Sequence, residues 1–199
     1  MIGIIDYGMG NVGSVESMIN YLGYYKTKIV TTPEELNDVD KIILPGVGTF
    51  DNGIKNLKDS GLFAELNTQV LIQNKPVLGI CLGMQLLMDK SEEGKLRGFG
   101  WIKGKCKKFV FDNKKLKVPH MGWNDVIPIN NRLCDEISRF YFVHSYYAEC
   151  KNKNNIMLET NYGIKFVSGI SNKDIFGVQF HPEKSHKYGM KLMKKFIEL

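Results

Sequence analysis

A cysteine between two glycines is the feature that most constrains the fold of this chain. The segment Gly79-Ile80-Cys81-Leu82-Gly83 follows an apolar run at 76–80 and precedes a helix-forming run at 84–88. A sharp strand-to-helix turn needs small flanking residues, because neighbouring backbone comes close, and it lifts its central side chain above a sheet. The pattern therefore predicts a nucleophile elbow with Cys81 at its tip. A helix beginning at Leu82 also directs free N–H groups and its positive dipole end at the sulfur, which favours a thiolate.

A cysteine nucleophile needs a base, and His181 has the most suitable context of the four histidines. It follows a second strand-like apolar run at 175–180 and lies two residues before Glu183, on the same side of an extended segment. The carboxylate can there fix the tautomer of the ring and support its protonated form. We predict Cys81 as nucleophile, His181 as general base and then acid, and Glu183 as the orienting group. The alternative is that Cys81 is an inert core residue and that His181 merely ends a strand.

Two motifs around these residues resemble those of the class I (triad) glutamine amidotransferases. They are Gly-Ile-Cys-Leu-Gly-Met-Gln at 79–85 and Gln-Phe-His-Pro-Glu-Lys-Ser at 179–185. Segments 6–11, 44–50 and 118–124 narrow the resemblance to the glutaminase subunit of imidazole glycerol phosphate synthase. The resemblance implies hydrolysis of glutamine to glutamate and ammonia through a cysteine thioester, with no metal or organic cofactor. It also implies a cyclase barrel subunit as partner, which uses the ammonia in histidine biosynthesis.

The remaining catalytic and substrate-binding residues are expected beside the elbow. Ligands of open α/β sheets bind at the carboxyl ends of the strands, so the loop after a strand at 41–44 should reach the site. We predict that the backbone N–H of Val47 or Gly48, with that of Leu82, forms an oxyanion hole. The resemblance implies that this loop needs its partner before its N–H groups point inward. It also implies that glutamine is held by the side chain of Gln85 and by the backbone of His144, Ser145 and Tyr146.

The resemblance further implies a docking face for the cyclase subunit. The residues expected there are Asn11, Ser14, His120, Trp123 and Lys184. Two of them also have a structural interpretation, because Asn11 can cap the following helix and Trp123 can fill the core.

The alternation of apolar segments predicts an α/β fold in one domain covering residues 1–199. The first part favours a mostly parallel, open, flavodoxin-like sheet with helices on both faces. Its expected elements are strands at 1–6, 28–31, 41–44 and 76–80, and helices at 12–22 and 61–73. Short β-rich pieces after residue 98 predict an antiparallel extension, at 107–111, 115–118, 140–147 and 165–170. A final strand and helix return to the sheet, and segment 151–155 is expected to be an exposed loop.

Composition narrows the classes of partner. The net charge is +6, but the lysines are dispersed and accompany no nucleic-acid-binding motif, so no nucleic acid is expected as a partner. The four cysteines lack CxxC spacing, which favours a reducing cytoplasm and does not suggest zinc. No apolar run approaches membrane-spanning length, so no membrane partner is expected.

Three alternative functions stay open. The chain can supply ammonia to a related synthase acting on a surface sugar, and segment 96–101 keeps this alternative open because it departs from the more aliphatic stretch expected of the subfamily. It can also be a cysteine peptidase on a similar scaffold, or a non-catalytic binding subunit. The contexts of Gln85 and His181 favour glutamine over a peptide, and the complete Cys-His-Glu set argues against a non-catalytic role.

Overall fold

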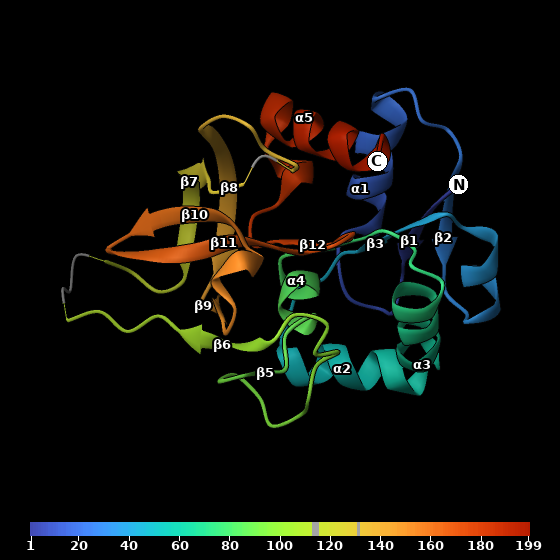
Figure 1. The fold of residues 1–199 in the computed structure, drawn as a ribbon, viewed down its shortest axis with the longest axis horizontal. Helices are drawn as coiled ribbons and strands as arrows, with labels where there is room; N and C mark the ends of the chain where they lie inside the picture. Colours follow the sequence, from blue (N-terminus) through green and yellow to red (C-terminus); the bar gives the residue numbers. More distant parts are fainter. Residues whose placement is uncertain (113–115, 131) are drawn as a thin grey trace.

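The computed structural model describes residues 1–112, 116–130 and 132–199, whose strands join in one mixed sheet (Figure 1). One part of the sheet is parallel and has the spatial order β2-β1-β3-β4-β12. Its strands are β1 (Ile2–Ile5), β2 (Thr27–Val30), β3 (Lys41–Leu44), β4 (Val77–Ile80) and β12 (Ile175–Val178). The expected parallel sheet is thus confirmed, and its strands end at one common edge.

Helices cover both faces of the parallel strands (Figure 1). Helices α1 (Val12–Tyr21) and α5 (His186–Ile197) lie on one face, and α2 (Phe50–Asp59) and α3 (Leu62–Asn67) on the other. Because neighbouring strand residues point to opposite faces, Ile4 packs in the core cluster beneath α1 and α5, and Ile5 packs in the cluster beneath α2 and α3. Burying each such side chain contributes about 2 kcal/mol.

Two helical expectations need correction. The helix expected at 61–73 is α3 followed by a π-helical segment, η2 (Thr68–Ile72). Helix α2 was not anticipated, although Phe50, Ile54 and Leu57 recur at helical spacing and are fully buried. No helix among the described residues is long and apolar enough to cross a membrane.

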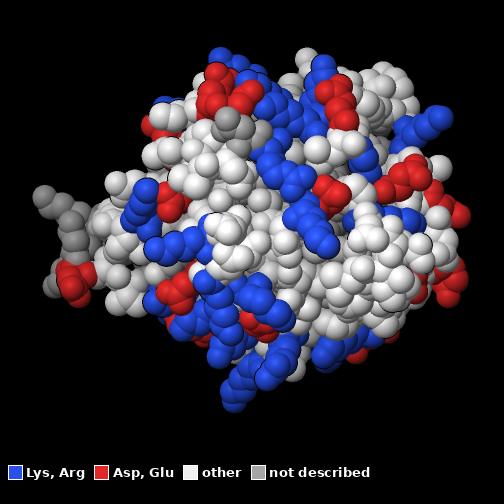
Figure 2. Space-filling view, viewed as in Figure 1, with Lys and Arg blue, Asp and Glu red and all other residues white. Residues whose placement is uncertain are grey.

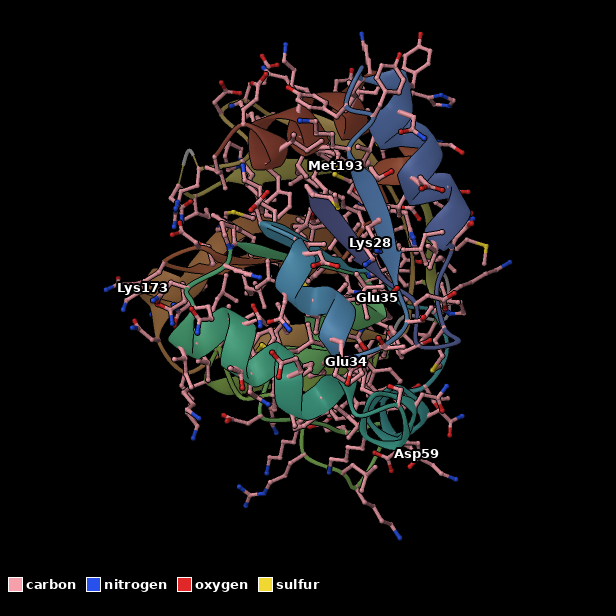
Figure 3. The ribbon with its side chains drawn as sticks, turned by 90° about the vertical axis from the view of Figure 1, so that its right-hand side faces the viewer. Lys28, Glu34, Glu35, Asp59, Lys173 and Met193 are labelled. Carbon is pink, nitrogen blue, oxygen red and sulfur yellow. The ribbon has the colours of Figure 1, made fainter. Side chains whose placement is uncertain are left out.

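Charged side chains protect the outer edge of the parallel part. Strand β2 ends the strand order, and Lys28 on β2 reaches the short helix η1 (Glu34–Asp38) that packs beside it (Figure 3). Its Nζ lies 3.7 Å from Glu35 Oε1 and 2.8 Å from Asp38 Oδ2. A paired charge on an edge strand disfavours pairing with a strand of another chain.

The antiparallel extension is confirmed, and it has two branches that diverge from β11 (Ile164–Asn172), the strand beside β12. One branch continues through β10 (Ile156–Tyr162), β7 (His120–Pro128) and β8 (Ser138–His144). The other runs through the antiparallel strands β9 (Tyr146–Cys150) and β6 (Gly104–Lys108) to β5 (Lys90–Ser91), which pairs with β6 in parallel. A short helix, η3 (Lys153–Asn155), lies in the mostly exposed segment expected to be a loop.

The predicted boundaries within the extension were less accurate. The strand expected at 140–147 is divided at Ser145 into β8 and β9, and the strand expected at 107–111 lies at 104–108. Residues 116–118 are not a strand, and Lys115 falls outside the described residues. The sequence pattern missed β7, whose more buried positions alternate with exposed ones, and β10, where the adjacent Met157 and Leu158 are both buried.

Candidate active site

The elbow at Cys81 is a strained turn between β4 and the short helix α4 (Leu82–Leu86). Cys81 has φ 54° and ψ −110°, a conformation that costs a residue with a side chain about 1–3 kcal/mol. Both flanking glycines are required by close backbone. A Cβ at Gly83 would lie 1.8 Å from the carbonyl oxygen of Leu44, and a Cβ at Gly79 would lie 2.7 Å from the Gly83 carbonyl carbon. The predicted geometry of the turn is therefore confirmed.

His181 and Glu183 meet just beyond β12, the strand paired with β4. His181 Nδ1 lies 2.7 Å from Glu183 Oε1, and both side chains are 3% exposed. Burial lowers the pKa of His181, but the Cys81 and Glu183 side chains outweigh burial and raise this pKa to about 10. The short helix η4 (Pro182–Lys184) turns Glu183 back toward the ring. The other ring nitrogen, Nε2, is buried and has no hydrogen-bond partner among the described residues.

A hollow of about 310 Å³ joins most of the predicted catalytic and binding residues. It is lined by the nucleophile, the base, the loop after β3 and the turn between β8 and β9: Val47, Gly48, Cys81, Leu82, Gln85, Val143, His144, Ser145, Tyr146 and His181. Glu93 and Pro119 also line it, and these two residues and Val143 were not predicted as site residues. Glu93 lies in the loop after β5, 12 residues after Cys81, and no local sequence signal indicates that it lines the same hollow.

The oxyanion hole is not arranged as predicted in one respect. The N–H of Leu82 donates to the carbonyl oxygen of Gly46 at 3.3 Å, so this donor is occupied. The first N–H groups of a helix have no partner within the helix, and here the loop after β3 supplies one. Tyr7 holds the same loop, because its hydroxyl donates to the Pro45 carbonyl at 2.9 Å.

Gln85 is fixed by two hydrogen bonds at the floor of the hollow. Its Nε2 donates to the Tyr146 carbonyl at 3.3 Å and to Gln179 Oε1 at 3.1 Å. Both amide hydrogens are thereby engaged, which leaves Oε1 as the atom that Gln85 can present to a ligand.

The expectation that His120 lies on a docking face is corrected. Its ring is 2% exposed and stacks on Tyr162 at a centroid distance of 4.0 Å. Across the β7–β8 ladder, its Nδ1 lies 2.9 Å from Nε2 of His144. Burial lowers the pKa of His120 to about 4. Burial also lowers the pKa of His144, to about 3, and repulsion from His120 and His181 adds to this shift, whereas the hydrogen bond to the Tyr146 carbonyl opposes it. Both rings are therefore neutral near pH 7.

The other residues expected at a docking face lie at the surface. Asn11, Ser14 and Lys184 line one shallow hollow of about 580 Å³ between α1 and η4. Asn11 also caps α1, because its Oδ1 accepts the N–H of Ser14 at 3.3 Å. Trp123 is 40% exposed, and its ring stacks on that of His186 at a centroid distance of 5.6 Å. His186 also lines that hollow. The four side chains thus form a continuous surface that His120 does not share.

The described residues hold no cluster of three or more His, Cys, Asp or Glu side chains suited to a metal ion. The four cysteines are free thiols.

Comparison with known proteins gives the same family along the whole chain. A family model described as "Glutamine amidotransferase class-I" matches residues 3–199. "Imidazole glycerol phosphate synthase subunit HisH 2" of Methanococcus maripaludis is 54% identical over 202 residues, which cover 100% of this chain and 99% of that protein. A protein with the same description from Pseudomonas aeruginosa is 48% identical over 203 residues, covering 100% of both. The corresponding subunit HisH of Leptospira interrogans is 45% identical, with the same coverage.

Solved structures share the fold at low sequence identity. A chain described as "Crystal structure of glutamine amidotransferase" has a TM-score of 0.79 and 16% identity, covering 99% of this chain and 97% of that one. "Structure of PurLQS from Thermotoga maritima" has a TM-score of 0.76 and 20% identity, with the same coverage. These likenesses show the fold.

Proposed function

Because the chain belongs to the class-I glutamine amidotransferase family, we propose that it is the glutaminase subunit of an imidazole glycerol phosphate synthase. It hydrolyses glutamine to glutamate and passes the ammonia to a cyclase subunit in histidine biosynthesis. The observation that carries this proposal is that Cys81, at a strained elbow, and His181, whose ring is paired with the buried Glu183, line one hollow. Relatives at 45–54% identity over the whole chain support the choice of synthase.

The first half-reaction forms a thioester. His181 takes the proton of the Cys81 thiol as general base, and Glu183 stabilises the imidazolium that forms. The sulfur attacks the side-chain amide carbon of glutamine and forms a tetrahedral oxyanion. His181 then gives its proton to the departing nitrogen, and ammonia leaves as the C–N bond breaks.

The second half-reaction releases glutamate. His181, now neutral, takes a proton from water, and the resulting hydroxide attacks the thioester carbon. The C–S bond breaks and the thiolate of Cys81 is restored beside the imidazolium. Glu183 keeps Nδ1 of the ring protonated and stabilises its positive charge, so that Nε2 faces the reacting atoms in both halves.

Oxyanion stabilisation requires the loop after β3 to move. In the described arrangement the Gly46 carbonyl covers the N–H of Leu82, which would otherwise donate to the oxyanion. Each such donor contributes about 3 kcal/mol to transition-state stabilisation. We infer that docking of the cyclase subunit draws this carbonyl away and turns an N–H of Val47 or Gly48 inward. Glutamine hydrolysis then proceeds only when an acceptor for ammonia is at hand.

The hollow offers complementary groups for glutamine. Gln85 Oε1 accepts an N–H of the substrate, and the backbone of His144, Ser145 and Tyr146 closes over its amino-acid end. Glu93 provides a carboxylate for the α-ammonium group. Its Oε2 accepts the N–H of Phe50 at 2.8 Å, and this bond fixes the carboxylate at the mouth of the hollow.

The docking surface for the cyclase consists of Asn11, Ser14, Trp123 and Lys184. An exposed tryptophan beside a lysine suits a protein interface, where aromatic side chains supply most of the binding energy. On the face shown in Figure 2, Lys and Arg side chains are interspersed with Asp and Glu. We expect the assembly to act in the cytoplasm, where its four free thiols stay reduced.

The test is glutamate release from glutamine by the purified chain, alone and with the histidine-pathway cyclase of the same organism plus its ribonucleotide substrate. Strong stimulation, lost in Cys81→Ala, is expected. A cyclase that is active with added ammonium salt but leaves glutamate release unchanged would refute the assignment to histidine biosynthesis.

A second synthase is a further candidate partner. Two of the relatives carry the copy number 2 in their descriptions, which favours testing whether this chain serves another acceptor. A paralogous role would supply ammonia to a synthase that aminates a surface sugar. Stimulation by such a synthase and none by the cyclase would establish that role, and the same Cys81→Ala variant serves as the control.

A further inference from the structure

A buried glutamine contacts the nucleophile and is not used in the mechanism above. Gln179 follows β12 and is fully buried, and its Nε2 lies 3.8 Å from Cys81 Sγ. Strands β4 and β12 run side by side with Val178 opposite Ile80, so the residues that follow them, Gln179 and Cys81, lie at the same edge of the sheet. A buried amide is expected to satisfy its hydrogen bonds, and here one donor is directed at sulfur.

The orientation of this amide follows from its neighbours. The Tyr146 carbonyl can only accept, so the atom of Gln85 that contacts it at 3.3 Å is the amide nitrogen. The second hydrogen on that nitrogen points to Gln179 at 3.1 Å, which requires the oxygen of Gln179 on that side. The amide nitrogen of Gln179 therefore faces the sulfur, and the reversed amide would place two nitrogen donors against each other.

The Tyr146 carbonyl is in turn held by the buried histidine pair. His144 Nδ1 lies 2.8 Å from this carbonyl and must donate to it, so Nε2 of the neutral ring accepts from His120 Nδ1 at 2.9 Å. His120 Nε2 then accepts from Asn124 Nδ2 at 3.2 Å.

The hydrogen bonds of Asn124, at the other end of this hydrogen-bonded series, require the same donors and acceptors. Asn124 Nδ2 also donates to the Asn161 carbonyl at 2.9 Å, and its Oδ1 accepts the N–H of Asp125 at 2.8 Å. Backbone partners at both ends thus require the same tautomers of His120 and His144. In each ring one nitrogen donates a hydrogen bond and the other accepts one. A proton added to the accepting nitrogen would face the N–H of its neighbour.

We propose that Gln179 donates a hydrogen bond that stabilises the thiolate of Cys81, and that His144 and His120 are positioning residues that act on it through the Tyr146 carbonyl. The proposal rests on the glutaminase function only for its consequence in catalysis, because the state of the sulfur can be measured without glutamine. A donor to the charged form of a group stabilises that form. The long N–H···S contact makes the effect smaller than that of His181.

Other titratable groups near the sulfur keep their charge when Gln179 is replaced. His181 and Tyr7 both interact electrostatically with Cys81, and burial raises the pKa of Tyr7, so its hydroxyl stays neutral. His144 is neutral, and the charge of His181 contributes to its lowered pKa. Replacement of Gln179 by an uncharged side chain therefore changes the hydrogen bond to sulfur while leaving these charges in place.

The experiment measures the rate of Cys81 alkylation by iodoacetamide against pH, resolved by peptide mass spectrometry, in Gln179→Met and in the matched control Gln69→Met. Gln69 is likewise buried and bonded to side chains, but it lies in η2, outside the site. We expect the alkylation midpoint to rise by about one pH unit in Gln179→Met, a tenfold lower thiolate fraction at a given pH below the midpoint. The control should keep the wild-type midpoint. A folded Gln179→Met protein with an unchanged midpoint would overturn the proposal.

Two more variants keep the test decisive. Gln179→Glu preserves the shape and places a carboxylate oxygen against the sulfur, so its alkylation midpoint should rise further than that of Gln179→Met. The glutamate variant decides alone where the methionine variant does not fold.

His120→Phe keeps the stacking on Tyr162 and removes the hydrogen bond to His144, away from the sulfur. It should raise the KM for glutamine several-fold with a smaller midpoint shift, and wild-type values of both would overturn the positioning role. Absence of glutamate release by the wild-type complex, with the midpoint shifts intact, would refute the proposed function alone.

Discussion

The two sides of the active-site hollow are held in different ways. The nucleophile side belongs to the parallel half, where Cys81 is fixed by backbone contacts around β3, β4 and α4 that leave no room for a methyl group at Gly79 or Gly83. The substrate side belongs to the antiparallel extension, where the turn at 144–146 is fixed by hydrogen bonds between side chains and carbonyls. Steric contacts are intolerant of any change, whereas hydrogen bonds weaken by degrees and depend on protonation.

This difference suits the division of labour proposed for the two sides. The attacking sulfur has to stay in one place through two half-reactions, and a strained turn maintained by close packing gives that constancy. The substrate side has to admit glutamine and release glutamate. Changes in the parallel half should therefore affect folding most, while changes in the extension should affect binding and pH dependence.

The largest effect is expected from Gly83→Ala. The added methyl group would lie 1.8 Å from the Leu44 carbonyl oxygen, so β3 and α4 must separate, and we expect the free energy of unfolding to fall by at least about 3 kcal/mol. Gly13→Ala is the matched control, because Gly13 lies in α1 with nothing within 4 Å, and it should gain up to about 1 kcal/mol. Denaturant unfolding measures both. Equal stability of the two variants would contradict the steric account of the elbow.

Acid should weaken the extension through its histidine pair. The pKa values of His120 and His144 are lowered to about 4 and about 3, so on acidification the unfolded chain takes up protons first. Stability is therefore complete above about pH 6.5 and is lost as pH falls toward these values, by up to about 1.4 kcal/mol per pH unit for each ring.

His120→Phe tests this acid dependence. It should reduce the slope of stability against pH between about pH 6.5 and 4, as followed by urea unfolding at each pH. An unchanged slope would show that carboxylates elsewhere account for the acid loss.

Alkali should weaken the parallel half through His181. Here the pKa is raised to about 10, so the folded state holds the proton more tightly than the unfolded chain. The sign is opposite to that of the extension: the contribution is fully present below about pH 6.5 and is lost as pH rises toward about 10. Glu183→Gln removes one of the groups that raise this pKa and should flatten stability over that range. If the variant keeps the wild-type slope, the His181–Glu183 pair is not the cause.

A smaller effect is expected at the mouth of the hollow. Glu93→Gln removes the charge proposed to meet the substrate ammonium group, and should raise the KM for glutamine about tenfold, equivalent to about 1.4 kcal/mol, with less change in kcat. The neighbouring Glu92 pairs with Lys105 at 3.1 Å outside the hollow, so Glu92→Gln is the control and should leave KM unchanged. Steady-state glutaminase assays of the complex distinguish the two residues. Equal KM values in both variants would exclude Glu93 from substrate binding.

The same division explains what the sequence could predict. Features of the parallel half are local: the elbow glycines and the spacing of His181 to Glu183 lie within a few residues, so periodicity and turn chemistry sufficed. The extension depends on pairing between distant segments. His120 meets His144 across a ladder, and no local pattern distinguishes that buried imidazole from an exposed one. The hydrogen bond from the N–H of Leu82 to Gly46 likewise joins the start of α4 to a loop 36 residues earlier, and it was missed.

The smallest effect is expected at the docking surface, which both halves share. Lys184 comes from the parallel half and is exposed, so Lys184→Ala should weaken the complex only several-fold, mainly by slowing association, and less so at high salt. Trp123→Ala, from the extension, should cost more, because a half-exposed aromatic side chain loses its whole contact area. Lys187, one turn along and outside the surface hollow, is the control for Lys184. Titration of the cyclase by surface plasmon resonance at two salt concentrations gives both rates. If Lys187→Ala weakens binding as much as Lys184→Ala, the effect is one of net charge, and Lys184 has no specific place in docking.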